Sequence, residues 1–202
     1  MVTPEPDPVR RRRRGAALES ALLDSAWEEL VEVGFGSLTM ESVAARAHTG
    51  IAVLYRRWAN KDELVLAAFE RYRHAHPVEI PDTGTLRGDL LALMTAVSQA
   101  RATFTAVAAA AAFSGLLADT GLTPAQARDK FLGDPPLRGD QIIYRRAHDR
   151  GEIDLGRTAP AVLTMPFDLL RHDMVMNLEP LPPARINSIV DDLFLPLVHV
   201  TP

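Results

Sequence analysis

Two short helices joined by a tight turn are predicted within residues 39–61, and this pattern limits the fold more than any other part of the chain. The first piece, 40–47, and the second piece, 51–58, each carry apolar residues on one side at helical spacing, and the turn His48-Thr49-Gly50 separates them. The apolar positions are Val43, Ala44 and Ala47 in the first piece and Ile51, Leu54 and Trp58 in the second. Because the alanines are small, the two helices can cross closely, as a helix-turn-helix requires.

The charges of this segment favour DNA as a partner. After Glu41 no acidic residue occurs until Asp62, and every charged residue between them is basic. The basic residues of the segment are Arg46, Arg56, Arg57 and Lys61. A positive helix without acids, whose apolar side faces inward, has the size and charge to enter a major groove.

The same segment resembles the DNA-binding unit of the TetR family of bacterial repressors. In that family a long helix ends in Gly-Phe, and Leu-Thr, an Ile/Val-Ala pair, a turn, a Leu-Tyr-x-x-aromatic recognition helix and a Lys follow. The matching residues are Gly34-Phe35, Leu38-Thr39, Val43-Ala44, His48-Thr49-Gly50, Leu54-Tyr55-Arg56-Arg57-Trp58 and Lys61. The resemblance covers roughly residues 16 to 65. It departs at the turn, where His48 and Thr49 replace a Gly and an apolar residue; His tolerates a left-handed backbone better than β-branched residues do.

The resemblance implies which residues contact DNA. Base edges would meet the front of the recognition helix, and phosphates would meet the tyrosine, the arginines and the lysine. The expected DNA-binding residues are Thr39, Thr49, Gly50, Ile51, Ala52, Val53, Tyr55, Arg56, Arg57 and Lys61. Ile51 and Val53 could instead pack inward, and Thr39 could serve only as a helix cap. Trp58 is predicted to be a core residue.

The composition agrees with a soluble DNA-binding protein. Of the 202 residues, 47% are hydrophobic and 24% charged, and cysteine is absent, which excludes disulfides and thiolate metal sites and suits a bacterial cytoplasm. The net charge of -4 arises in the C-terminal part: residues 1–75 hold 11 basic and 11 acidic residues, and the rest hold 11 and 15. The uncharged stretch Ala102 to Ala118 is shorter than the ~20 residues of a spanning helix. We therefore expect a core helix there and no membrane partner. When the protein is bound to DNA, we expect it to be associated with the nucleoid.

Three regions are predicted: a disordered basic arm (1–14), a helix-turn-helix domain (15–76) and a ligand-binding and dimerisation domain (77–202). Helices are expected at 16–33, 40–47, 51–58, from 61 to before Pro77, 86–100, 103–119, 137–150, 159–178 and 183–199. With no period-2 strand, the fold class is all-α with about nine helices. Thr39 is expected to cap its helix alone, since Ser42 replaces the acid of a capping box. The arm residues Arg10, Arg11, Arg12, Arg13 and Arg14 would form either a solvated tail or a minor-groove arm.

The stretch from Leu86 to Val198 resembles the ligand-sensing and dimerising region of actinobacterial TetR-family members, notably in RGEIDL, PFDLLRH and FLPLV. Large apolar residues there could line a pocket or simply pack in the core. These pocket candidates are Met94, Phe104, Phe113, Phe131 and Met165. The resemblance assigns the last two helices to the dimer interface, where the candidates are Phe167, Leu170, Met174, Ile189, Leu193, Phe194 and Leu197.

These patterns predict a TetR-type transcriptional regulator. The protein would bind a palindromic double-stranded DNA operator as a homodimer and leave it when an unidentified small molecule binds the C-terminal domain. No catalytic residue, metal site or cofactor is predicted; the pair His74-x-His76 is a poor metal signal, because residues i and i+2 do not share a helix face. Two other classes stay open: a sequence-tolerant architectural DNA-binding protein, and a small-molecule carrier or enzyme with a vestigial helix-turn-helix.

Overall fold

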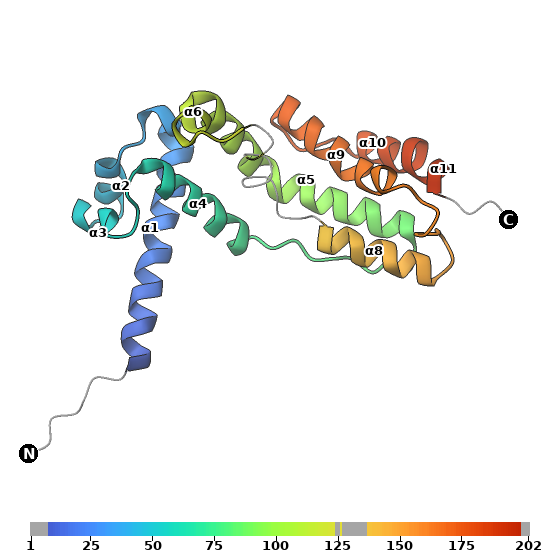
Figure 1. Ribbon diagram of the computed structural model, residues 1–202, viewed down its shortest axis with the longest axis horizontal. Coiled ribbons are helices and arrows are strands. Elements are labelled where there is room, and N and C mark those ends of the chain that lie inside the picture. The colour runs from blue at the N-terminus through green and yellow to red at the C-terminus, as the bar shows by residue number, and fades with distance from the viewer. Residues whose placement is uncertain (1–7, 124–125, 127–136, 199–202) are drawn as a thin grey trace, which may run out of the picture. The chain divides into compact units, whose positions relative to one another are not determined.

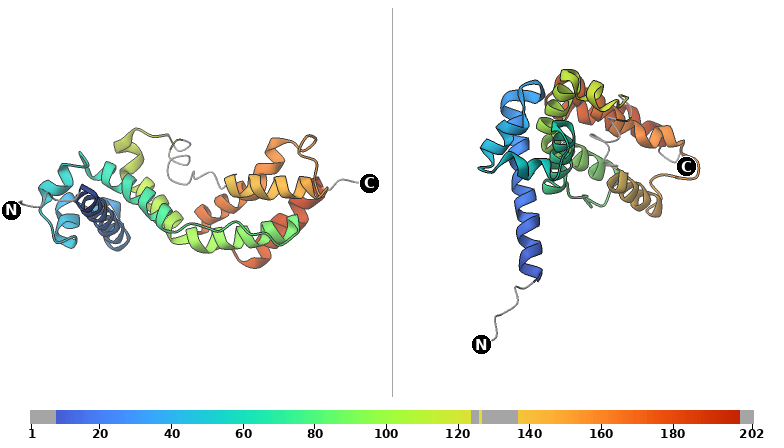
Figure 2. Two further views of the ribbon diagram at one scale, coloured as in Figure 1. Left: turned by 90° about the horizontal axis from the view of Figure 1, so that it is seen from below. Right: turned by 60° about the vertical axis from the view of Figure 1, so that its left-hand side comes forward.

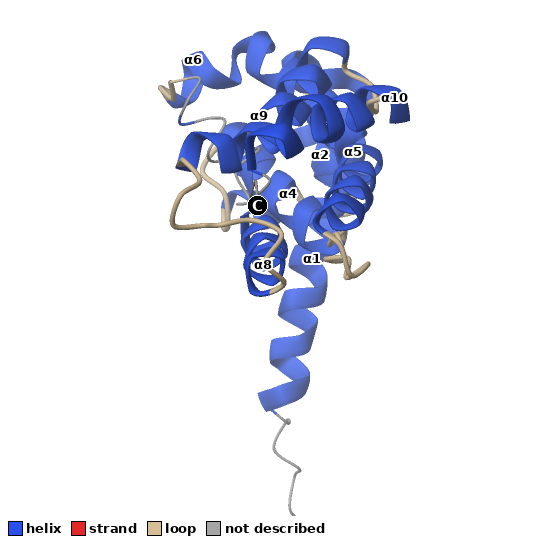
Figure 3. Ribbon diagram, turned by 90° about the vertical axis from the view of Figure 1, so that its right-hand side faces the viewer, coloured by secondary structure: helices blue, strands red, loops and turns tan. Residues whose placement is uncertain are grey.

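The computed structural model describes residues 8–123, 126 and 137–198, in which only helices and loops occur (Figure 3). No β-strand is present in this part of the chain, so the predicted all-α class is confirmed. The chain divides into two compact units. The first comprises Met1–His76 and Ala110–Pro124, and the second comprises Pro77–Ala109 and Ala125–Pro202. The second unit thus begins at the predicted boundary, whereas residues 110–124 belong with the DNA-binding helices.

The described part of the first unit is built from five α-helices and one π-helical turn. Its elements are α1 (Pro8–Ser37), α2 (Met40–Arg46), α3 (Ile51–Tyr55), α4 (Lys61–Ala75), the π-helical turn η1 (Ala112–Leu116) and α6 (Leu117–Thr120) (Figure 1). Helix α1 packs along α4, and their contact is filled by fully buried apolar side chains. The principal ones are Leu22, Ala26 and Leu30 on α1 and Leu64, Val65 and Phe69 on α4.

Helix α1 is longer than predicted, and the right-hand view of Figure 2 shows it from the side. It begins at Pro8 instead of Ala16, so the expectation of a disordered segment is wrong for residues 8–14. Proline suits the first position of a helix and arginine is a good helix former, which accounts for the longer helix. Near the other end, Gly34 has a φ of 74°, which breaks the regular helix before α2.

The second unit consists of long and short helices around one apolar core. Its elements are α5 (Leu86–Ala111, whose last two residues belong to the first unit), α8 (Leu137–Asp149), α9 (Pro160–Asn177), α10 (Pro183–Asn187), the π-helical η3 (Ser188–Phe194) and α11 (Leu195–Val198). The core combines side chains from all of them, including Leu90, Met94, Ile143, Tyr144, Phe167, Leu170, Ile189 and Phe194. The π-helical turns of η3 end just before Pro196, which has no N–H to donate to a regular helix.

The helix break predicted after Ala100 does not occur. Helix α5 runs without interruption from Leu86 to Ala111, because Arg101 and Ala102 favour helix and no proline or glycine occurs between Gly88 and Gly115. Together with η1 and α6 it forms the stretch Leu86–Thr120, whose most apolar 18-residue window has a mean hydropathy of 1.4. By length and composition alone this stretch could cross a membrane, a property it shares with core helices of soluble proteins.

A buried carboxylate lies in the second unit at a position that sequence reasoning did not single out. Asp140, on the first turn of α8, is only 3% exposed, and its Oδ1 accepts a hydrogen bond from the backbone N–H of Gln141 at 2.5 Å. Among the described residues no cation pairs with it. Burial therefore raises the pKa of Asp140. Its charge also acts on Tyr144 one turn later, whose pKa is raised mainly by burial and whose hydroxyl donates to the carbonyl of Leu163 at 2.8 Å.

Replacing Asp140 by asparagine should stabilise the second unit at neutral pH by about 1 kcal/mol, because an amide is cheaper to bury than an unpaired charge. Since the folded-state pKa is raised, this group's contribution to stability is fully present below the unfolded pKa of about 3.9 and is lost as pH rises through the folded pKa. Urea unfolding at pH 7 and pH 4 measures both effects. Asp149→Asn on the exposed side of α8 is the control, and equal results for the two variants would contradict the argument.

Candidate nucleic-acid interface

Helix α2 starts with a reciprocal cap. The Thr39 hydroxyl accepts from the N–H of Ser42 at 3.0 Å, and the Ser42 hydroxyl oxygen accepts from the N–H of Thr39 at 3.2 Å. The prediction of a single cap was therefore wrong, because a serine replaces the usual acid of the capping box. Thr39 is exposed, so the cap fixes the direction of a side chain that also faces solvent at the helix N-terminus, where phosphate is favoured.

The turn between α2 and α3 has the backbone that its residues suggested. His48 adopts a φ of 50°, the left-handed conformation that histidine tolerates, and this agrees with the predicted variant turn. The N–H of Thr49 donates to the carbonyl of Ala44 at 2.9 Å, which closes the turn. Gly50 is the N-cap of α3 and supplies no side-chain bond, so the first N–H groups of α3 stay free of side-chain caps.

Helix α3 is short, and two buried side chains anchor it: one within the helix and one three residues after its end. It covers only Ile51–Tyr55, whereas a helix through Trp58 was expected. Leu54 is fully buried, and Trp58 is buried as predicted. With α3 anchored through Leu54, its opposite side is presented to solvent. The exposed residues there are Gly50, Ala52, Tyr55 and Arg56, and Thr49, Ile51 and Val53 are partly buried.

The cations around α3 differ in whether their side chains already have polar partners within the chain. The Arg57 guanidinium donates to the carbonyl of Val53 at 3.2 Å and lies 4.0 Å from a Glu19 oxygen. The Lys61 ammonium donates to the carbonyl of Phe35 at 3.2 Å and lies 4.3 Å from the centre of that ring. Arg56 is exposed and has no polar partner within the described ranges. Arg56 is therefore the cation most available to an external phosphate or base.

Arg46 is not available to DNA, although the sequence grouped it with the basic residues of this segment. Its guanidinium pairs with three acids of α1: with Glu29 at 2.6 Å, with Glu32, and with Glu28 at 4.0 Å. Hydrogen bonds from Arg46 and Ser42 hold the pKa of Glu29 below its usual value, against the opposing effect of burial. This cluster ties α2 to α1 and neutralises part of the acidic face of α1.

The arginine run can be placed only by its backbone. Residues 10–14 lie in α1, and their side chains fall outside the described part of the structure. A helix with its side chains is about 10–12 Å across, whereas the minor groove is about 6 Å wide. A helical run is therefore too wide to enter a minor groove of that width as a helix.

The pocket candidates of the second unit do not all lie in one place. Met94 and Phe104 are buried, and Met165 is partly buried against the core. Phe113 is 89% exposed and belongs to the first unit, so its assignment to the pocket was wrong. The π-helical η1 and the φ of 115° at Gly115 account for this, because they rotate the apolar face that a regular helix would keep inward. Phe131 lies outside the described residues.

The dimer candidates also separate into two groups. Five are buried in the core of their own unit and cannot form an interface between folded protomers; these are Phe167, Leu170, Met174, Ile189 and Phe194. The correction follows from helix geometry, since one face of α9 and of η3 is used within the chain. The other two candidates, Leu193 and Leu197, are exposed, and sequence reasoning missed the exposed Met176 near the end of α9.

The first unit, with its capped α2, tight turn and solvent-facing α3, defines a helix-turn-helix DNA-binding protein. Two family models match the chain: "Bacterial regulatory proteins, tetR family" at residues 22–68 and "Tetracyclin repressor-like, C-terminal domain" at residues 80–193. The chain belongs to the TetR family of bacterial transcriptional regulators.

Known proteins agree with this assignment. The chain is 32% identical to the DNA-binding transcriptional repressor TetR of Mycobacteroides abscessus, over 92% of this chain and 96% of that protein. It is 34% identical to an HTH-type transcriptional regulator of Mycobacterium tuberculosis, over 88% and 86%. Among solved structures, the fatty acid degradation regulator FadR of Bacillus halodurans has the same fold, with a TM-score of 0.59 at 14% identity, covering 95% and 97% of the two chains. The family is one of regulators, not of enzymes.

Proposed function

We propose that this regulator is a homodimeric repressor that binds a palindromic operator and releases it when a small molecule binds the second unit. The exposed side of α3 supports the first part, because it combines small residues at its front with Tyr55 and Arg56 at its end. Small residues allow close approach to base edges and contact with thymine methyl groups, and the larger residues reach phosphates. This arrangement carries the proposal.

The proposed DNA contacts can be ranked by the structure. Tyr55 and Arg56 are exposed and come first, while Arg57 and Lys61 would have to share or exchange their present partners. Thr39 and the free N–H groups at the start of α3 add donors at helix N-termini. We propose no role for Arg46, whose charge is already used within the unit.

A dimer is proposed because one short recognition helix reads too few base pairs, whereas two related by a twofold axis read half-sites about 34–36 Å apart. The exposed apolar residues Met176, Leu193 and Leu197 on the last helices supply apolar area for such an interface. Release would follow from a ligand that binds one conformation of the dimer better than the other.

Leu197→Asp should weaken the proposed dimer at least about tenfold, because a carboxylate would replace an apolar side chain that is 60% exposed in the single chain. Sedimentation velocity over a range of concentrations measures the dissociation constant. Ile142→Asp, at an exposed apolar position of α8, is the matched control. An unchanged dimer in Leu197→Asp would place the interface elsewhere.

Selection of bound sequences from random duplex DNA at physiological salt tests the function as a whole. We expect a palindrome with two half-sites. Binding that tolerates any sequence would favour an architectural protein, and no binding at low salt would favour a carrier with a vestigial helix-turn-helix. A recovered palindrome would also allow its genomic positions to indicate the regulated genes and, through them, the effector.

A further inference from the structure

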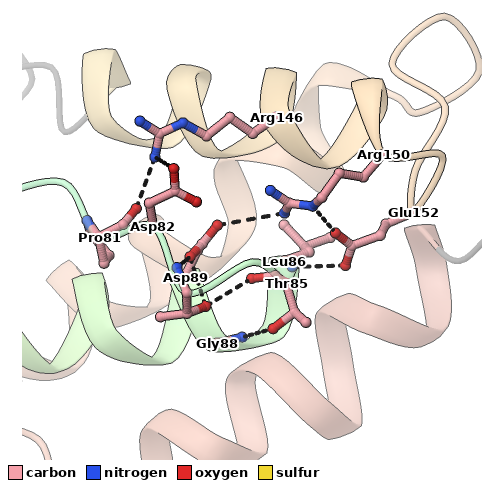
Figure 4. Close-up of polar contacts among 10 residues, drawn as sticks. Pro81, Asp82, Thr85, Leu86, Gly88, Asp89, Arg146, Arg150 and Glu152 are labelled. Atoms are coloured by element: carbon pink, nitrogen blue, oxygen red, sulfur yellow. Dashed lines mark hydrogen bonds and ion pairs between the residues drawn. The ribbon is translucent and has the colours of Figure 1, made fainter.

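The chain that leaves the DNA-binding helices is fastened by a polar network within the second unit (Figure 4). Residues 76–85 connect α4 to α5, and α8 lies beside the start of α5. We call four side chains of this network the linker clamp: Asp89 on α5, Arg146 on α8, and Arg150 and Glu152 just after α8. None of them was predicted as a functional residue, although Arg150 and Glu152 belong to the RGEIDL motif.

The two arginines reach the linker and the start of α5 from one side of α8. Arg146 donates to the carbonyl of Pro81 at 3.0 Å and pairs with Asp82 at 3.5 Å. Arg150 donates to Glu152 at 2.5 Å and lies 3.5 Å from Asp89. The spacing of four residues places both guanidinium groups on the same helical face.

The two acids of the linker clamp accept hydrogen bonds from backbone N–H groups and a side-chain hydroxyl. Asp89 is fully buried, and its Oδ1 accepts from the N–H of Thr83 at 2.6 Å and from the Thr83 hydroxyl at 2.8 Å. Its Oδ2 makes no hydrogen bond, so the Arg150 guanidinium is the group that offsets its charge. Glu152 accepts from the N–H of Leu86 at 2.7 Å and so caps α5. Removing Arg150 would leave Asp89 buried without a cation.

The linker also packs closely on α5. The Thr85 hydroxyl accepts from the N–H of Gly88 at 3.1 Å. A Cβ at Gly88 would stand 2.3 Å from the Thr83 hydroxyl, which is closer than real contacts allow. The glycine therefore permits Thr83 to reach Asp89. Such close packing leaves little room for residues 83–85 to move independently of the start of α5.

We propose that Arg146 and Arg150 are positioning residues that fasten the linker to α8, so that a shift within the sensing unit is passed to the segment of chain that leads back to α4. Only residues 76–80 separate the end of α4 at Ala75 from the fastened segment. Helix α8 carries Ile143, Tyr144 and Ala147 into the core on its neighbouring face, so a shift of α8 within the sensing unit would move the linker as well. This inference rests on the proposed function, because the restraint matters for a dimer that reads two half-sites.

The test compares Arg150→Ala with Arg145→Ala, which removes the same charge from an exposed position of α8. Amide hydrogen exchange, followed by NMR on the full chain, reports the N–H groups of Thr83, Leu86 and Gly88. We expect at least about tenfold faster exchange in Arg150→Ala and no change in Arg145→Ala. If Arg150→Ala does not fold, Arg146→Ala takes its place, because it keeps the Asp89–Arg150 pair and should speed exchange more mildly. Arg150→Lys, which keeps the positive charge, should restore part of the protection.

The second readout is the ratio of affinities for a duplex with two half-sites and a duplex with one. A looser linker lowers the effective concentration of the second DNA-binding unit of the dimer at its half-site. The ratio of affinities should therefore fall about three- to tenfold in Arg150→Ala or Arg146→Ala. The inference would be overturned if amide exchange in Arg150→Ala were unchanged. It would also be overturned if exchange were faster but the ratio of affinities equalled that of Arg145→Ala. A wild-type ratio near one would instead show that the dimeric reader itself, the proposed function, is wrong.

Discussion

Phe69→Ala should lower the free energy of unfolding the DNA-binding unit by about 3–5 kcal/mol. Phe69 is only 1% exposed, and its ring meets Trp27 of α1 edge-on, with ring centres 6.2 Å apart. Truncation removes most of this side chain and leaves a cavity between α1 and α4. Because the whole unit is stabilised by that contact, thermal or urea unfolding should show the loss directly, and DNA binding at 37 °C should fall with it.

The chain offers a matched control in the same unit. Phe113→Ala removes the same atoms from a side chain that is almost fully exposed, and we expect a change within about 0.5 kcal/mol. A large loss of stability in Phe113→Ala would mean that something covers this ring in solution. Equal effects of the two substitutions would contradict the packing described for α1 and α4.

Tyr55→Phe combined with Arg56→Ala should weaken operator binding about 100-fold, through lost phosphate contacts in both subunits. Both side chains are exposed beyond the buried Leu54, so the double variant should keep its fold. Fluorescence anisotropy at several salt concentrations measures the affinity and its salt dependence. Each phosphate contact that is lost should lower the log–log slope by about 0.9.

Arg57→Ala serves as the comparison, because Arg57 already bonds to the carbonyl of Val53 and should cost less affinity than Arg56→Ala. Loss of affinity for all sequences alike would agree with phosphate contact. A loss confined to one operator position would show that Arg56 reads a base instead. If Arg57→Ala has the larger effect, the ranking of the two arginines derived from their partners is wrong.

Much of the first unit could be predicted from the sequence, because its signals are local. The apolar spacing of α2 and α3, the Asn60 cap of α4 and the left-handed turn at His48 each depend on residues a few positions apart. The end of α8 at Asp149, two residues before Gly151 with its φ of 79°, was predictable for the same reason. These features agree with the prediction to within a few residues.

The availability of each cation could not be predicted, because it depends on distant partners. Arg46 bonds to Glu29, 17 residues earlier in the chain, and Lys61 bonds to the carbonyl of Phe35, 26 residues earlier. The sequence shows a basic segment, but only the packing of α1 shows which charges are already paired. Helical periodicity also failed at Phe113, where the π-helical turn changes the face.

The use of each face of the last helices could not be predicted from the sequence either. An apolar helix in this family can contribute to its own core, to a partner or to both, and spacing alone does not separate these uses. On α9, Met174 is buried in the core of its own unit, whereas Met176, two positions later, is exposed. The buried charges of the linker clamp were missed because isolated acids and arginines in a sequence do not show that they will meet.

The cap of α5 by Glu152 has a consequence for the order in which the chain folds. The donor, the Leu86 N–H, and its acceptor, Glu152, are 66 residues apart, so this bond must wait until the chain has been made beyond the end of α8. During synthesis the helix-turn-helix emerges first and has its caps in its own sequence, whereas the start of α5 emerges uncapped. The Leu86–Glu152 bond can therefore form only when more than three-quarters of the polypeptide has been made, whereas the local bonds of Thr83 and Thr85 to Asp89 and Gly88 can form earlier.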